Sequence, residues 1–137
     1  TAVYTSVFYD GVSLDVTNFG FVAVPMPDVS LAEMEAAVDA VIAKFLTDGV
    51  DQEAFDRIKR QLRADEIYAR DNVAGLARTY GAALTGGLTV VDVQAWPDVL
   101  QAVTPEEVMV AAREVLNRKN AVTGWLMKEE TDAEAGQ

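Results

Sequence analysis

The residue types that most enzymes use for metal binding and nucleophilic catalysis are missing from this chain. Its 137 residues include no histidine and no cysteine. Without cysteine there is no disulfide, thiolate metal site or thiol nucleophile, and without histidine there is no Ser–His–Asp triad and no imidazole ligand for zinc. Carboxylates alone would favour Mg²⁺, Ca²⁺ or Mn²⁺. Composition by itself therefore indicates a fold without a reaction centre.

The densest group of charges lies in the middle of the chain, where residues 57–63 hold four of the eleven basic residues. Such a cluster could meet an acidic partner or substrate. We favour a solvated helix face, because acids follow at the helical spacing that allows side chains to pair. The basic residues are Arg57, Lys59, Arg60 and Arg63, and the acids are Asp51, Glu53, Asp56, Asp65 and Glu66.

Three other features could carry chemistry but have simpler interpretations. The adjacent acids Glu106–Glu107 lie where a helix begins, and acids there stabilise the helix dipole. The pair Gly86–Gly87 is not followed by the rest of a phosphate-binding motif and indicates a helix end. We expect Trp96 and Trp125 in the core or at a domain interface. None of these groups defines a site by its spacing.

The charge balance limits the kinds of partner. With 22 acidic and 11 basic residues, the chain has a net charge of −11. Nucleic acids and anionic membranes attract proteins with a surplus of Lys and Arg, so we expect neither partner. No apolar run approaches the ~20 residues that span a bilayer. Residues 129–137 carry four acids and no base, and we expect them to form an acidic, frayed tail.

Hydrophobic periodicity predicts strands at both ends of the chain and helices between them. Residues 2–9 and 15–24 alternate like strands and predict an antiparallel hairpin. Capping signals then predict five helical segments. These begin at Ser30 (ending at Gly49), at Asp51, near Val73 (ending at Gly86–Gly87), at Thr89 (halted near Pro97) and at Thr104. Residues 120–127 alternate again and predict a last strand.

The predicted order is therefore β-β-α-α-α-α-α-β. Such an order is typical of an α+β fold, here an antiparallel sheet with helices packed on one face. No linker, repeat or low-complexity stretch divides the chain, so we expect residues 1–128 to belong to one domain.

Several motifs along residues 2–128 resemble the C-terminal part of the pitrilysin/insulinase-like zinc metallopeptidases, whose relatives include mitochondrial processing peptidase. The segment Ala2–Val7 is similar to that family's "aYsv" strand, and Gly49–Lys59 to its "gvteeElerak" helix start. Further matches in order are Phe19–Val24, Arg78, Tyr80, Gly81, Trp96 and Val103–Val108. The resemblance implies one half of a LuxS/processing-peptidase-like α/β domain pair that closes around a peptide.

The resemblance also implies how the catalytic work is divided. In this family the first domain holds zinc with an inverted His-x-x-Glu-His motif, which has no counterpart here, so zinc would be bound in the parent protein outside this chain. The second domain supplies an arginine and a tyrosine that bind and polarise the peptide carbonyl. Tyr4 falls on that tyrosine, whereas the arginine would lie before Thr1. An ordinary strand tyrosine at a domain face is the alternative for Tyr4.

From the resemblance we expect a substrate-binding, closing C-terminal portion of a peptidase that does not hydrolyse peptides alone. Its partners would be a peptide substrate and a zinc-bearing N-terminal domain or homologous subunit. The sheet edge near residues 16–25 could hold an extended peptide by strand addition. The alternative is a catalytically inactive partner or scaffold subunit of a zinc-bearing homologue. The segment TAVYTSV does not resemble a signal peptide, and both the bacterial periplasm and the cytoplasm stay open.

Overall fold

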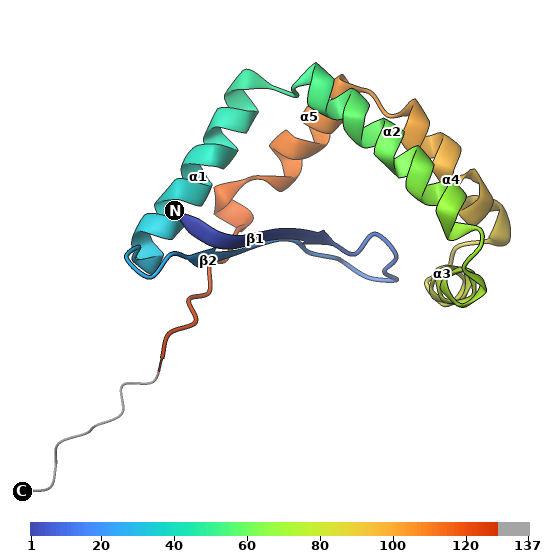
Figure 1. The fold of residues 1–137 in the computed structure, drawn as a ribbon, viewed down its shortest axis with the longest axis horizontal. Coiled ribbons are helices and arrows are strands. Elements are labelled where there is room, and N and C mark those ends of the chain that lie inside the picture. Colours follow the sequence, from blue (N-terminus) through green and yellow to red (C-terminus); the bar gives the residue numbers. More distant parts are fainter. Residues whose placement is uncertain (129–137) are drawn as a thin grey trace, which may run out of the picture.

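The computed structural model describes residues 1–128, and its first element is an antiparallel hairpin (Figure 1). Strand β1 (Ala2–Tyr9) pairs with β2 (Phe19–Pro25) in a regular register from Tyr4↔Val24 to Tyr9↔Phe19. The register shifts between Ala2 and Tyr4, so that Val3 forms a bulge. The predicted hairpin is confirmed, although its second strand begins at Phe19 rather than near residue 15.

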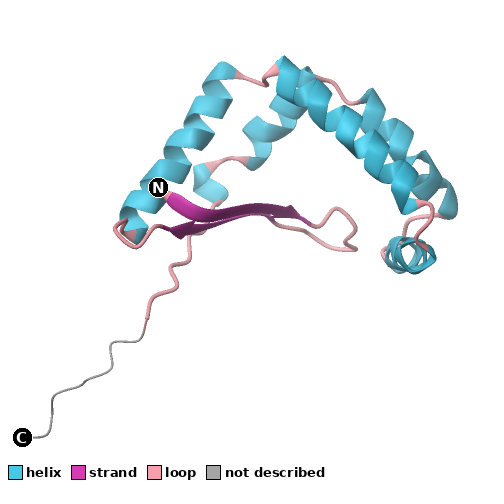
Figure 2. Ribbon diagram, in the orientation of Figure 1, coloured by secondary structure: helices cyan, strands magenta, loops and turns pink. Residues whose placement is uncertain are grey.

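Five helices follow the hairpin, joined by short turns (Figure 2). Figure 1 shows α1 and α5 above the hairpin, while α2 and α4 run side by side away from it and α3 lies beyond the hairpin loop. The helices are α1 (Leu31–Asp48), α2 (Gln52–Ala69), α3 (Val73–Thr85), α4 (Val90–Ala102) and α5 (Pro105–Val115). The fold is α+β, as predicted.

Helix starts are set by local capping, which explains why their positions could be predicted. At α1 the Ser30 hydroxyl accepts from the Glu33 amide at 3.2 Å, and the Glu33 carboxylate accepts from the Ser30 amide at 2.9 Å. Thr89 and Thr104 form the same reciprocal box at α4 and α5, and Asp51 caps α2. Each box satisfies amides that the first turn leaves without helical partners.

Two predicted features are wrong. Helix α4 runs through Pro97 to Ala102 instead of halting there. Proline removes one helical hydrogen bond. The turn after it is nevertheless held against α2, where the side-chain amide Nε2 of Gln101 donates to the Lys59 backbone carbonyl at 3.1 Å. The predicted last strand is also not formed, since residues 121–128 have no strand partner within the described chain. An extended segment without a ladder is not a stable strand.

The core of the described residues is small. Only Met34, Ala83 and Met109 are buried hydrophobic residues within residues 1–128. Trp96 is 58% exposed and Trp125 49%, so neither tryptophan lies in a core of the described part. No described helix has both the length and the apolar character that a membrane crossing requires. The predicted tail, residues 129–137, lies outside the described residues.

The capping box of α5 makes a first prediction about stability. Replacing Thr104 with Ala removes the hydroxyl that accepts from the Glu107 amide at 3.2 Å, and should lower the free energy of unfolding by about 1 kcal/mol. Urea unfolding followed by circular dichroism measures the change. Thr104→Ser keeps the capping oxygen and should stay within a few tenths of a kcal/mol of the wild type; equal losses in both variants would contradict the capping role.

The box of α1 predicts a dependence on pH. The Ser30 hydroxyl and the Ser30 amide, in that order, hold the pKa of Glu33 below its usual 4.5. A carboxylate whose pKa is lowered by folding contributes stability above its unfolded pKa and loses it as pH falls through the folded value. Glu33→Gln should therefore be less stable than the wild type at neutral pH, and the difference should shrink as the pH falls below 4.5 and through the lowered pKa of Glu33. A constant difference across urea titrations at all pH values would contradict this assignment.

Candidate functional site

Tyr4 lies near the start of β1, directly after the bulge at Val3. Its side chain is 55% exposed, and among residues 1–128 no hydrogen bond involves its hydroxyl. A bulge changes the face on which the following side chains point. The phenol predicted to meet a substrate therefore stands on an accessible sheet face, in a direction that the bulge helps to set.

The face around Tyr4 carries no charge. The register places Tyr4 opposite Val24, Ser6 opposite Val22 and Phe8 opposite Gly20, and neither strand contains a charged residue. The Phe8 ring covers Gly20 so closely that a Cβ there would lie 2.2 Å from its Cζ. Gly20 thus lets an aromatic ring cross β2 at this point.

A second feature is a cavity of about 580 Å³ beside β2. One wall is β2, with Phe19, Phe21 and Ala23, and another is α1, with Leu31, Met34 and Val38. Residues of the C-terminal segment, from Ala121 to Trp125, also line it. Tyr4 is not among the lining residues.

The cavity lies along β2. Its lining includes Phe21 and Ala23 from one face of the hairpin, and Phe8 and Gly20 from the other. Phe8 belongs to β1, and its ring lies over Gly20, where it reaches the cavity. Strand β2 pairs with β1 on one side, and within residues 1–128 no further strand pairs with it. The strand that walls the cavity is therefore also the one whose outer edge is unpaired in the described chain.

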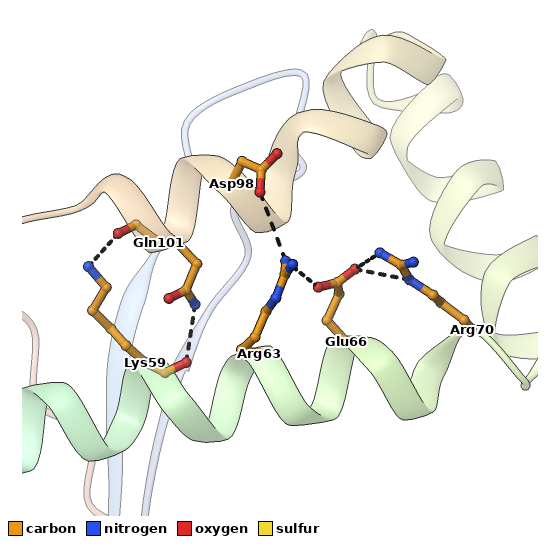
Figure 3. Close-up of polar contacts among 6 residues, drawn as sticks. All are labelled: Lys59, Arg63, Glu66, Arg70, Asp98 and Gln101. Atoms are coloured by element: carbon orange, nitrogen blue, oxygen red, sulfur yellow. Dashed lines mark hydrogen bonds and ion pairs between the residues drawn. The ribbon is translucent and has the colours of Figure 1, made fainter.

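The basic cluster of α2 only partly forms the solvated, paired face that we expected (Figure 3). Of the five neighbouring acids, Glu66 is the one that forms ion pairs: with Arg63 at 2.8 Å and with Arg70. These arginines, Arg70 first, lower the pKa of Glu66 below its usual 4.5. Arg63 also approaches Asp98 of α4 at 3.9 Å.

Lys59 turns away from the acids and toward α4. Its ammonium donates to the carbonyl oxygens of Gln101 at 2.5 Å and Val103 at 2.9 Å, at the C-terminal end of that helix. It also lies 5.2 Å from the ring centroid of Phe55. A cation at a helix C-terminus satisfies carbonyls that lack helical partners. Sequence reasoning missed this contact, because no local signal links residues 42 positions apart.

The remaining candidates are structural. Glu107 closes the capping box of α5, as expected. Gly86–Gly87 ends α3, also as expected, with Gly87 at φ +88°. The same two glycines lie against the hairpin loop. A Cβ on Gly86 would lie 2.7 Å from Cγ1 of Val12, and one on Gly87 would lie 3.2 Å from Cδ2 of Leu14. These glycines thus contribute to holding the hairpin loop against α3.

No cluster of three or more acidic, histidine or cysteine side chains within residues 1–128 could hold a metal ion. No model of a known protein family matches the chain, and no curated protein matches it. The resemblance to zinc peptidases rests on the sequence motifs.

The α2–α4 contact makes a prediction. Lys59→Met removes the donor from two partly buried carbonyls, and should lower the free energy of unfolding by about 1–3 kcal/mol. Arg60→Met is the control, because it removes one positive charge from an exposed neighbour on the same helix. Urea unfolding measures both variants, and a loss in Arg60→Met equal to that in Lys59→Met would show that the contact with α4 is not the cause.

Proposed function

We propose that this chain is the substrate-binding, closing portion of a zinc-dependent metallopeptidase that hydrolyses peptides. It would act with a zinc-bearing N-terminal domain or homologous subunit. Zinc, bound outside this chain, would activate water for attack on the peptide carbonyl. The observation that carries the proposal is the position of Tyr4, exposed on an uncharged sheet face directly after a bulge.

The exposed apolar surface supports a chain that works against another polypeptide. Both faces of the hairpin carry exposed apolar side chains: Tyr4, Phe8 and Val22 on one face and Val7 and Phe21 on the other are each at least two-fifths exposed. Large contiguous apolar surfaces commonly mark interaction sites. A covering domain or subunit would bury such a surface and place Tyr4 at the boundary between the two bodies.

The chemistry assigned to Tyr4 is donation of a hydrogen bond. In a closed complex its phenol would donate to the carbonyl oxygen of the scissile peptide, where negative charge grows as water attacks. Donors aimed at a developing oxyanion stabilise the transition state more than the ground state. This role requires only that the phenol O–H donates a hydrogen bond, without transfer of its proton.

The edge of β2 is suited to hold the substrate chain. Its outer backbone groups are unpaired within residues 1–128, and the strand lines a cavity of mixed polar and apolar character. An extended peptide that pairs with such an edge gains backbone hydrogen bonds, and adjacent pockets receive alternate side chains. The chain would thus contribute orientation of the substrate as well as the tyrosine.

Substitution of Tyr4 tests its role in the parent peptidase. Tyr4→Phe should lower kcat by a factor of about 10²–10³, the usual effect of losing one oxyanion donor, with little change in KM. Tyr9→Phe is the control, since Tyr9 lies on the same strand and the opposite face. Unchanged turnover in Tyr4→Phe would make Tyr4 an ordinary strand residue.

The division of labour is tested with purified chains. This chain alone should neither bind zinc stoichiometrically by calorimetry nor cleave a fluorogenic peptide, since it lacks histidine and cysteine. Cleavage should appear when a zinc-bearing domain or homologous subunit is added. Zinc-dependent turnover by the chain alone would overturn the proposal. If Tyr4→Phe has no effect on a reconstituted complex, the inactive scaffold subunit becomes the better description.

A further inference from the structure

Residues 121–127, which we call the C-terminal strap, lie across the cavity beside β2. The strap contributes Ala121, Val122, Thr123 and Trp125 to the lining, opposite Phe19 and Phe21 of β2. It therefore occupies the same side of the hairpin as the unpaired β2 edge. Figure 1 shows the chain leaving α5 and passing the hairpin.

Two polar contacts hold the strap and the turn before it to α1. The Trp125 indole donates to a Glu35 carboxylate oxygen at 3.0 Å. At the other end, the Arg118 guanidinium pairs with Asp39 at 2.5 Å. Glu35 and Asp39 are four residues apart, so they lie on one face of α1. The strap runs antiparallel to α1 between these anchors.

The strap has the chemistry of an extended peptide. Val122, Gly124 and Leu126 alternate with Ala121, Thr123 and Trp125, and Ala121 has extended dihedral angles, φ −95° and ψ 148°. Alternation of this kind is what strand addition requires. Yet the strap forms no strand, and Val122 and Leu126 are 97% and 96% exposed. A segment that is strand-like in sequence thus stays unpaired next to a strand edge.

The two contacts that anchor the strap to α1 are exposed, so another ligand can replace them. The Arg118 side chain is 77% exposed and that of Asp39 38%, and exposed ion pairs contribute little stability. The Trp125–Glu35 contact is exposed as well. The strap is therefore held to α1 only by contacts that contribute little stability.

We propose that the C-terminal strap is an internal competitor at the β2 edge, which an incoming extended peptide must displace from α1. This inference rests on the peptide-binding edge of the proposed function and adds its regulation. Loss of the α1 anchors frees the edge, and a peptide of the strap's own type then binds in its place.

Peptide binding to the full chain tests the competition. The probe is a fluorescein-labelled peptide with the sequence of residues 120–128, followed by fluorescence anisotropy. The double variant Glu35→Ala/Asp39→Ala should bind it at least ten-fold more tightly than the wild type does. Asp65→Ala/Asp71→Ala, which makes the same charge change on exposed residues of another part of the chain, should bind like the wild type. A peptide of scrambled order controls for sequence.

Trp125 supplies a second readout. In a Trp96→Phe background it is the one tryptophan left in the chain. With an unlabelled probe in which phenylalanine replaces the probe's own tryptophan, the Trp125 emission should shift when the probe displaces the strap. If the probe binds all variants with equal affinity and the emission does not shift, the strap is not a competitor. The proposal that the β2 edge binds peptides would still stand. If the probe binds to no variant, the proposal that the β2 edge binds extended peptides is wrong, and the strap proposal fails with it. The test of Tyr4 by kcat does not depend on this result.

Discussion

The backbone ladder between β1 and β2 is the interaction on which the candidate site depends. Its register places Tyr4 opposite Val24 after the bulge at Val3, and separates that face from the one with Phe19 and Phe21. It pairs β2 on one side and leaves its other edge unpaired within residues 1–128. A two-stranded ladder is marginally stable alone, so contacts of its loop with Gly86–Gly87 help to support it.

Residues 1–128 leave much of their apolar surface uncovered. Both the proposed function and the strap proposal depend on this exposed surface. A charge-free hairpin, a small core and an unpaired strand edge are the features of a surface that meets another polypeptide. In the proposed function, a zinc-bearing domain, the substrate peptide and the strap would occupy adjoining parts of this surface. Tyr4 and the β2 edge lie on the same hairpin, so one element would orient the peptide and approach its carbonyl.

Most helix boundaries were predictable because each depends on neighbouring residues. The capping boxes at Ser30, Thr89 and Thr104 satisfy their own first turns wherever the helix packs. The end of α4 was not predictable, because the turn after Pro97 is held by Lys59 of α2. The prediction of a last strand was wrong for a related reason. Alternation in residues 120–127 predicts the ability to pair, but a strand also needs a partner edge.

Local sequence by itself determined the hairpin, the helix starts, the missing histidine and cysteine, and Tyr4 as a candidate, because these follow from residue type and short-range spacing. Tertiary structure alone decided that Tyr4 is exposed beside a bulge, that Lys59 caps α4 and that the strap lies along α1 next to β2. These contacts join residues 20 to 90 positions apart. Their formation depends on how whole elements pack, which no short window of sequence contains.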